Sequence, residues 1–377
     1  MTPHPEPEHM PQLDGLRALA VTAVAVSHWT PNFLAGIVPW GTGVQLFFVL
    51  SGFLITGILL RSQPAVVGLP MGQVLRVFYA RRFLRIFPLY YGVLALALIF
   101  SVGPIREDWP WHVSYLSNWL YAREGHGGIL ADPFLHFWSL SVEEQFYLAW
   151  PFVALLAGRR ALLVILLVSI VGSMVCRVAV AHLATGIVSI RYLTPCCLDA
   201  LAVGGLVAHV KHYRGSVAVG RLAWWLAAIG FVGLAFSTIP LARLANPADA
   251  HRVGHTFLVV FYGAIVAWAA LGFRSVPGQI LSFAPMRYLG KISYGLYVYH
   301  YFAPYVVQGA ARQFGWDGLL QSTPALLVTY TVFSIVVSAL SWHLYELPLN
   351  RLKRHFSYPR ASAPPTPGAQ KPAPAGA

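Results

Sequence analysis

The stretch "LDGLRALAVTAVAVSHW", residues 13–29, has the composition of a membrane span that also carries ionisable side chains. After Asp14 near its start, the ionisable residues in this run are Arg17 and His28. Eleven residues make about three helical turns, so a helix would place Arg17 and His28 on one face, about 16 Å apart along its axis. Asp14 falls one turn from Arg17 near the same face, and we expect the two side chains to pair.

Two interpretations of these side chains are open. Arg17 could mark the inner membrane boundary, and His28 could be a packed histidine that bonds a neighbouring carbonyl group. Alternatively, both face one cavity, because ionisable groups inside a span are costly and usually face a cavity or a partner. In that case Arg17 would contact an anionic ligand, and His28, deeper in the same cavity, would act as a general base.

The rest of the chain has the same apolar character. Of its 377 residues, 57% are hydrophobic and only 10% are charged, whereas soluble domains carry about 25% charged residues. A span needs about 20 mainly apolar residues, and we therefore expect an all-α, polytopic membrane protein with about ten transmembrane helices. The expected spans lie near residues 13–31, 44–62, 83–102, 140–157, 161–179, 193–210, 222–240, 256–273, 288–308 and 322–345.

Basic residues are distributed unequally between the two sides of these spans. Ten spans put both termini on one side, and if that side is the cytoplasm, eighteen of the 26 Lys and Arg residues lie in inner segments. Seven, Arg177 among them, lie in outer segments, and Arg17 lies within the first span. Cytoplasmic segments of membrane proteins carry such an excess. The net charge of +13 therefore reflects topology, and we expect no nucleic-acid partner.

The chain is expected to have three parts. A short cytoplasmic N-terminus, 1–12, precedes the membrane domain, 13–350, and a cytoplasmic tail follows at 351–377. The tail is first basic and then rich in Pro and Ala, and we expect it to be disordered because it has nothing to bury. The outer segment 103–139 is a long loop rich in Trp and Tyr. Its rings could stack on sugars or form an interfacial belt.

Two further segments place polar side chains in apolar helices. In "VQLFFVLSGFLITG", residues 44–57, Ser51 and Gly52 permit the close approach of a neighbouring backbone or a ligand. In "VFYARRFLRIFPLYY", residues 77–91, Arg82 and Arg85 share a helix face at a spacing of three. These arginines either mark the inner membrane boundary or form a phosphate clamp, for which the guanidinium fork is suited.

The segment "HFWSLSVEEQFYLAWP", residues 136–151, opens the fourth expected span with two acids and an amide. Glu143 and Glu144 point about 100° apart on a helix, so only one is expected to face a given cavity. A single acid could complement the helix dipole, but two acids and Gln145 exceed that need. In "LGKISYGLYVYHY", His300 lies in the ninth expected span, where packing is its expected role.

Together, these motifs resemble the acyltransferase-3 family of bacterial membrane O-acyltransferases. The resemblance covers roughly residues 11–350, and the motifs occur in the family's order. They are D-G-L-R at 14–17, R-x10-H from Arg17 to His28, F-F-x-x-S-G at 47–52, R-x-x-R at 82–85, W-S-L-S-V-E-E-Q-F-Y at 138–147 and S-Y-G-L-Y-x-Y-H at 293–300.

The resemblance implies transfer of an acyl group, usually acetyl, from cytosolic acyl-CoA to a hydroxyl of a cell-surface carbohydrate or a secreted glycosylated product. Arg17, Arg82 and Arg85, with Ser51, would then hold the CoA, and His28 would be the catalytic histidine. The glutamate pair would take part in catalysis near the acceptor path. The expected location is the bacterial cytoplasmic (inner) membrane, within the lipid bilayer and with both termini cytoplasmic, and no metal is expected.

A proton-coupled transporter of a polysaccharide intermediate or a small solute is the alternative function. Intramembrane Arg, His and Glu side chains also suit proton-coupled transport. Transporters often contain paired repeats and helices that are broken within the membrane, and the sequence indicates neither. Binding of acyl-CoA and release of free CoA distinguish the enzyme from the transporter.

Overall fold

The computed structural model describes residues 10–29, 42–124, 132–184, 189–238, 247–316, 318 and 322–358. Every regular element in these ranges is a helix, as predicted. The long helices are α1 (Pro11–Trp29), α2 (Gly43–Arg61), α4 (Met71–Phe100), α7 (Phe137–Leu156), α8 (Arg159–Leu183), α9 (Leu198–Thr238), α11 (Pro247–Leu271) and α16 (Thr323–Ser341). The shorter ones are α3 (Pro64–Val67), α5 (Ile105–Val113), α6 (Ser117–Glu124), η2 (Ile190–Tyr192), η3 (Thr194–Cys197), α12 (Val276–Ser282), α13 (Ala284–Lys291), α14 (Ser293–Tyr299), α15 (Ala303–Phe314), η5 (Trp342–Glu346), α17 (Leu347–Arg351) and η6 (Leu352–His355).

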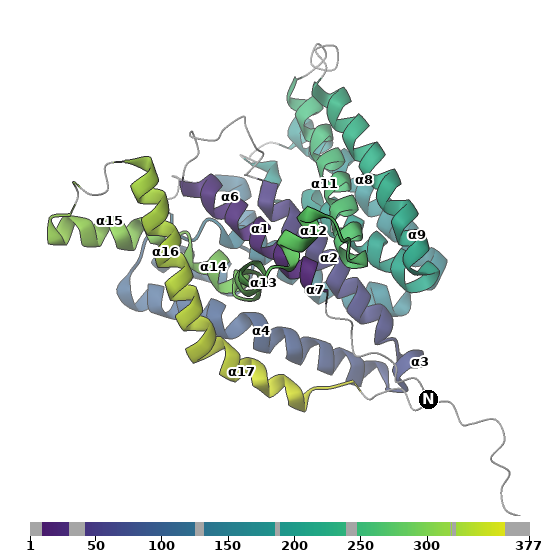
Figure 1. Ribbon diagram of the computed structural model, residues 1–377, viewed down its shortest axis with the longest axis horizontal. Helices are drawn as coiled ribbons and strands as arrows, with labels where there is room; N and C mark the ends of the chain where they lie inside the picture. Colours follow the sequence, from purple (N-terminus) through teal and green to yellow (C-terminus); the bar gives the residue numbers. More distant parts are fainter. Residues whose placement is uncertain are drawn as a thin grey trace, which may run out of the picture.

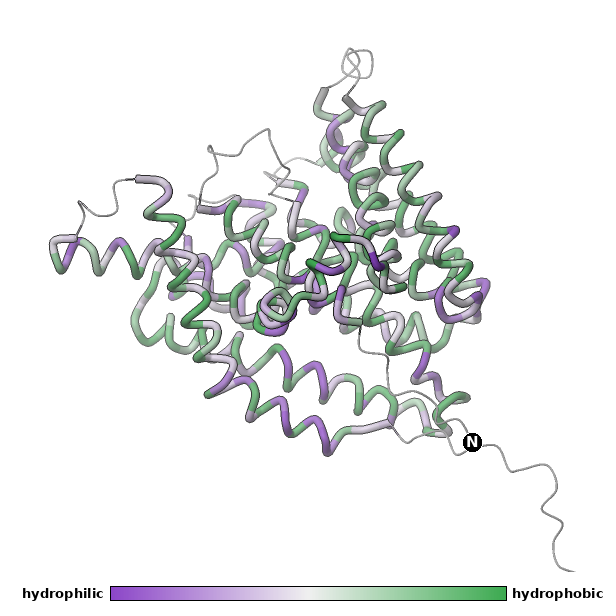
Figure 2. The backbone as a smooth tube through the Cα atoms, in the orientation of Figure 1, coloured by the Kyte–Doolittle hydropathy of each residue, from purple (hydrophilic) through white to green (hydrophobic). Residues whose placement is uncertain are grey.

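Several long helices consist mainly of hydrophobic residues (Figure 2). Leu183 on α8, Trp224 on α9 and Val328 on α16 are exposed large hydrophobic side chains. Within the described ranges, six helical segments are long and apolar enough to cross a membrane. Exposed apolar side chains on such helices are expected where the surrounding solvent is lipid. The chain is therefore a polytopic, multi-pass membrane protein, as predicted.

Helices α8, α9 and α11 form a bundle to one side of the molecule, and α9 packs closely along α11 (Figure 1). Helix α9 is divided by Gly215, whose φ of 76° is non-helical. Glycine adopts this backbone conformation at little cost because it has no Cβ. The sixth and seventh expected spans, 193–210 and 222–240, lie mainly on the two arms of α9, whereas 194–197 form η3 and 239–240 lie outside the described residues.

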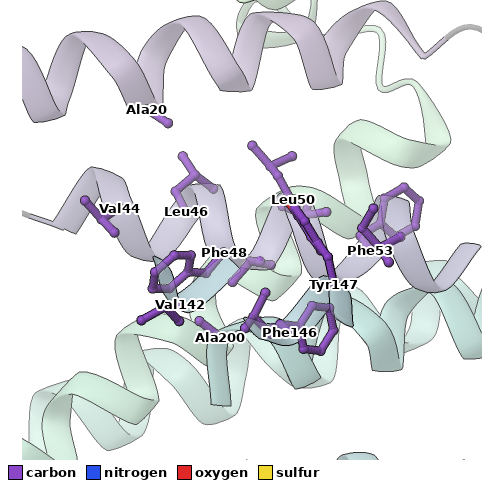
Figure 3. Close-up of a cluster of buried hydrophobic side chains, with 14 of the residues drawn as sticks. Ala20, Val44, Leu46, Phe48, Leu50, Phe53, Val142, Phe146, Tyr147 and Ala200 are labelled. Carbon is purple, nitrogen blue, oxygen red and sulfur yellow. The ribbon is translucent and has the colours of Figure 1, made fainter. Parts of the chain in front are cut away.

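The core lies where α1, α2, α7 and α9 meet (Figure 3). Helices α2 and α9 approach closely in it, and a Cβ added to Gly52 would lie 1.9 Å from the carbonyl oxygen of Leu201. A Cβ on Gly204 would lie 1.9 Å from the carbonyl oxygen of Val49. The prediction that Gly52 permits a close approach is confirmed, and the neighbour is the backbone of α9.

The expected ninth span, 288–308, is not one helix. The chain is divided among α13, α14 and α15, and a turn separates α14 from α15. Pro304 lies in the first turn of α15, where its missing N–H does no harm, whereas inside a longer helix it would remove a hydrogen bond. Helix α15 points away from α16 in Figure 1. The prediction of an unbroken span was wrong here, as was the expectation of no broken helix.

The outer segment 103–139 is helical and packed in much of its described part, because it contains α5 and α6. Tyr115 and Tyr121 are buried, and the Tyr115 ring stacks on Tyr90 of α4 with centroids 4.4 Å apart. These two rings therefore belong to the core and neither contact sugars nor form a belt. Trp109 and Trp119 are exposed, so either role stays open for them. Residues 125–131 lie outside the described residues, as do 1–9 and the Pro- and Ala-rich tail from 359 onward.

Arg177, which the charge count assigned to the outer segments, lies inside α8 and is buried. Its Nη2 donates to Oδ2 of Asp199 at 2.7 Å, and its Nη1 donates to the carbonyl oxygen of Cys196 at 2.5 Å. This ion pair joins α8 to the start of α9. Arg177 is therefore a structural residue and not a topology signal. When it is not counted among the outer basic residues, the excess of basic residues in the inner segments becomes larger.

Candidate active site

A cavity of about 110 Å³ lies among α1, α2, α4, α7 and α14. Its walls are apolar and aromatic over much of their area, with ionisable groups among them. Burying such groups in a membrane domain is costly, so their gathering at one place marks a functional site. Six of the residues predicted from sequence line this cavity: Arg17, Ser51, Arg82, Arg85, Glu143 and Glu144.

Three arginines form the cationic part of the cavity wall. Arg17 is paired with Asp14 as predicted, with Nη1 to Oδ1 at 3.0 Å. The guanidinium groups of Arg82 and Arg85 are close enough to Arg17 for mutual electrostatic repulsion. Arg85 also lies over the ring of Trp342, 5.2 Å from its centroid. Like charges held together in this way favour an anionic ligand between them.

Arg81 has a different environment from its neighbour Arg82. It is exposed, and its Nη1 donates to the carbonyl oxygens of Lys353 at 3.2 Å and Phe356 at 2.7 Å. It is not among the residues that line the cavity. Arg81 therefore attaches the segment after α17 to α4, whereas Arg82 and Arg85 face the cavity.

Glu143 is held by two hydroxyl groups. Ser51 Oγ donates to its Oε1 at 2.7 Å, and Tyr147 Oη donates to its Oε2 at 3.0 Å. Both carboxylate oxygens thus accept hydrogen bonds, which fixes the orientation of the side chain toward the cavity. Ser51, expected to contact the donor, is bonded to this acid.

Glu144 lines the same cavity, so the expectation that only one glutamate would face it was wrong. The cavity wall includes α2 as well as α4 and α14, so it covers a broad face of α7, and two side chains about 100° apart both reach it. Oε1 of Glu144 is buried and has no hydrogen-bond partner among the described residues. An unsatisfied buried acceptor costs about 1–3 kcal/mol, so this oxygen is suited to receive a donor from a ligand.

Gln145 does not line the cavity. Its Nε2 donates to the carbonyl oxygen of Tyr115 at 2.8 Å and to Oδ1 of Asn118 at 2.9 Å. Thr194 donates its hydroxyl proton to Oε1 of the same amide. Gln145 therefore ties α7 to α6 and η3, and its role is structural.

His28 is not among the residues that line the cavity with Arg17, contrary to the expectation of one shared cavity. Its Nδ1 lies 2.9 Å from Nε2 of His300, and the two rings are stacked with centroids 5.2 Å apart. Tyr297 explains the separation, because its side chain lines the cavity while its carbonyl oxygen lies 2.7 Å from Nδ1 of His300. His300 therefore contacts the candidate catalytic histidine directly and is buried among rings, and its expected packing role stays a prediction.

Sequence reasoning missed Tyr297, Ser139 and His136. Tyr297 and Ser139 are joined by a hydroxyl–hydroxyl hydrogen bond, and Tyr297 Oη also donates to the carbonyl oxygen of His136 at 2.9 Å. The ring of His136 lies 5.1 Å from that of His300 in a T-shaped arrangement. Tyr297 precedes His300 by one helical turn, and this spacing was the available signal for it.

The fold and this cavity define a multi-pass helical membrane protein with a charged reaction or binding chamber. A family model described as an acyltransferase domain, that of the acyltransferase-3 family, matches residues 10–343. The chain belongs to the acyltransferase-3 family, and the resemblance predicted from its motifs is confirmed.

Curated relatives agree with this assignment. The chain is 30% identical over 318 residues to the peptidoglycan O-acetyltransferase OatA of Listeria monocytogenes, covering 78% of this chain and 49% of that protein. It is 29% identical over 321 residues to the O-acetyltransferase OatA of Staphylococcus aureus, with coverages of 78% and 50%. It is 28% identical over 365 residues to the putative peptidoglycan O-acetyltransferase YrhL of Bacillus subtilis, with coverages of 90% and 55%. The chain thus spans about half the length of these relatives, and no solved structure matches it.

Proposed function

We propose that the protein is a membrane O-acetyltransferase that moves an acetyl group from cytosolic acetyl-CoA to a hydroxyl of a cell-surface glycan. The observation that carries this proposal is the cavity that brings three arginines and two glutamates together within a membrane domain. Two of the relatives named above are peptidoglycan O-acetyltransferases by name, one of them putatively. Peptidoglycan is therefore the first acceptor to test.

The cationic wall is the proposed donor site. Arg17, Arg82 and Arg85 would hold the phosphates of CoA, because guanidinium groups form charge-assisted, bidentate bonds to phosphate oxygens. Binding a polyanion would also relieve the repulsion among the three cations. On α1, His28 lies about 16 Å beyond Arg17 along the axis, roughly the reach of an extended pantetheine arm. Because Tyr297 separates the cavity from the histidines, its side chain must move aside when the pantetheine arm of CoA enters.

The proposed topology places the donor site on the cytoplasmic side of a bacterial cytoplasmic membrane, with both termini inside. Its support is the excess of basic residues in the inner segments, which increases once Arg177 is recognised as structural. Arg17 lies in the N-terminal half of α1, toward that side, whereas His28 lies near the other end. The acceptor hydroxyl would approach from the outer side.

The test is CoA release by purified protein in lipid nanodiscs, supplied with acetyl-CoA and with or without muropeptides. We expect release that depends on the acceptor. A folded protein that does not bind acetyl-CoA and releases no CoA with any glycan would contradict the proposal. A proton-coupled transporter would move protons without cleaving the thioester. The broken segment at α14 and α15 does not favour that alternative, because transporters of this kind pair their broken helices between two repeats, and we find no counterpart to it among the described residues.

A further inference from the structure

Three groups from α14, its following turn and α1 form a chain of hydrogen bonds. Nδ1 of His300 lies 2.7 Å from the carbonyl oxygen of Tyr297, and Nε2 of His300 lies 2.9 Å from Nδ1 of His28. The side chain of His300 is buried. Its backbone is also fixed, because Nε1 of Trp29, the residue after His28, donates to the carbonyl oxygen of His300 at 2.9 Å. Two neighbouring residues of α1 thus contact His300, the residue after α14, and together they fix the position of one imidazole relative to the other.

These hydrogen bonds determine which ring nitrogens of His300 and His28 carry a proton. A carbonyl oxygen only accepts, so Nδ1 of His300 must carry a proton and donate it to Tyr297. A neutral imidazole has one N–H, and a second proton on a buried ring without an acidic partner on either nitrogen is disfavoured. Nε2 of His300 is therefore an acceptor, and Nδ1 of His28 must donate to it. In a neutral His28, the form that a general base needs, the lone pair is then on Nε2.

We propose that His300 is a positioning residue that holds His28 in the tautomer with its proton on Nδ1 and its basic lone pair on Nε2. This proposal rests on the function proposed above, in which His28 is the general base. The hydrogen bond made by one ring nitrogen sets the state of the other. In hydrolases with a catalytic triad a carboxylate performs this task. Here a neutral imidazole performs it, which costs less than a carboxylate to bury in a membrane domain.

The reaction step balances with these assignments. Nε2 of His28 takes the proton of the acceptor hydroxyl while the hydroxyl oxygen bonds to the thioester carbonyl carbon. The carbon–sulfur bond then breaks, and the proton passes from Nε2 to the departing sulfur, which leaves as CoA thiol. During the step, Nε2 of His300 accepts from Nδ1–H of His28 and stabilises the imidazolium.

Two substitutions of His300 distinguish a positioning role from a packing role. His300→Gln keeps an acceptor oxygen at about the reach of the imidazole Nε2, whereas His300→Leu fills similar space without an acceptor. We expect His300→Leu to lower kcat for CoA release by about 10²-fold, within the range for loss of general-base help, with KM for acetyl-CoA unchanged. His300→Gln should stay within about tenfold of wild type by retaining the acceptor. Equal losses in both variants, or a loss confined to KM, would overturn the proposal.

A matched control is His209→Leu. His209 on α9 is also buried and contacts a carbonyl oxygen, that of Arg159 at 3.0 Å, and it is not among the residues that line the cavity. This variant should leave kcat and KM unchanged. In a His28→Ala background, His300→Leu should cause no further loss, because the residue acts only through His28.

A spectroscopic readout tests the tautomer without any activity. Nitrogen NMR of protein labelled with ¹⁵N-histidine, with the His28 signals assigned by their loss in His28→Ala, distinguishes protonated from unprotonated ring nitrogens. We expect His28 to be protonated at Nδ1 in the wild type and in His300→Gln, and not uniformly so in His300→Leu. Protonation at Nε2 in the wild type would refute the positioning role. The expected tautomer in a protein that releases no CoA would instead refute the proposed function and leave the assignment standing.

Discussion

Arg81 and Arg82 are adjacent in the chain, yet one is bonded to backbone carbonyls at the end of the membrane domain and the other faces the cavity. The same division separates Gln145, which ties helices together, from the two glutamates before it. A helix turns by about 100° per residue, so neighbours in one motif need not share a role. We therefore expect substitutions of neighbouring residues in one motif to have different effects.

The first prediction concerns the donor site. Arg85→Ala should raise KM for acetyl-CoA about tenfold to a hundredfold, because a charge-assisted bond to phosphate contributes about 1.5–3 kcal/mol. Arg85→Lys should restore only part of the affinity, because an ammonium group lacks the bidentate fork. Arg81→Ala is the matched control and should leave KM unchanged. An Arg85→Ala protein that is folded and has wild-type KM would remove Arg85 from the donor site.

The second prediction distinguishes the role of Glu143 from that of Gln145, both on α7. Glu143→Gln should lower kcat for CoA release by at least tenfold, because an amide cannot accept at both positions from Ser51 and Tyr147. Gln145→Ala should lower thermal stability, because it leaves buried partners unsatisfied at about 1–3 kcal/mol each, while kcat per folded molecule stays near wild type. Both quantities can be measured on the same nanodisc preparations. A kcat loss in Gln145→Ala that matches Glu143→Gln would contradict this division.

Much of this site was predictable because ionisable residues in apolar segments are costly wherever they occur. That argument identified Arg17, Arg82 and Arg85 from local sequence. It could not identify the contact between His28 and His300, which are 272 positions apart in the chain. Their pairing depends on how α14 packs against α1, and local periodicity carries no information about it.

Among the elements, the crossing of α2 and α9 places Ser51 and Glu143 relative to the rest of the cavity. The two helices approach at Gly52 and Gly204 with no room for a Cβ on either. Small residues serve this purpose in membrane helices because they let backbones approach closely. The cavity geometry therefore depends on a contact that lies one residue from Ser51.

The third prediction tests this crossing. Gly52→Ala should reduce both thermal stability and CoA release, because the new Cβ would lie 1.9 Å from the carbonyl oxygen of Leu201 and the helices must separate. Gly172→Ala on α8 is the control, because a Cβ there meets nothing within 4 Å. It should leave stability unchanged or raise it by up to about 1 kcal/mol. Equal stability of the two variants would show that the close approach is not required.

The fourth prediction concerns helix α5. Burial lowers the pKa of His112 to about 3, from about 6.5 in an unfolded chain. Between these values the unfolded chain binds a proton that the folded protein does not, so stability is lost as the pH falls from about 6.5 toward 3. The melting temperature should therefore fall between pH 7.5 and pH 5 by less in His112→Phe than in the wild type. An identical fall in both proteins would show that His112 does not contribute.

Element positions were largely predictable because a membrane span is a local property of length and apolarity. The expected spans 13–31 and 44–62 lie within two residues of the ends of α1 and α2 wherever the structure describes them. The break after α14 was missed because the segment that contains Tyr297 and His300 is as apolar as an unbroken span, although Pro304 shortly after it was an available signal.

For the whole molecule, the asymmetry of basic residues and the order of groups along α1 point to one arrangement. In the proposed topology the arginines of the cavity would face the cytoplasmic side, and the histidine pair would lie toward the outer side. Charge asymmetry sums over many segments, so sequence alone predicts it well. The separation of the cavity from the histidines by Tyr297 needed the structure, and the proposed function depends on the claim that the acyl arm passes this side chain.

Sealed vesicles that contain the purified protein test this claim most directly. [¹⁴C]Acetyl-CoA is supplied on the side that the arginines face, after the orientation has been determined by labelling, and a muropeptide acceptor is supplied on the other side. The account predicts labelled acceptor across the membrane with the wild type and none with His28→Ala, although that variant should still bind acetyl-CoA. Transfer that requires donor and acceptor on the same side, or undiminished transfer by His28→Ala, would contradict it.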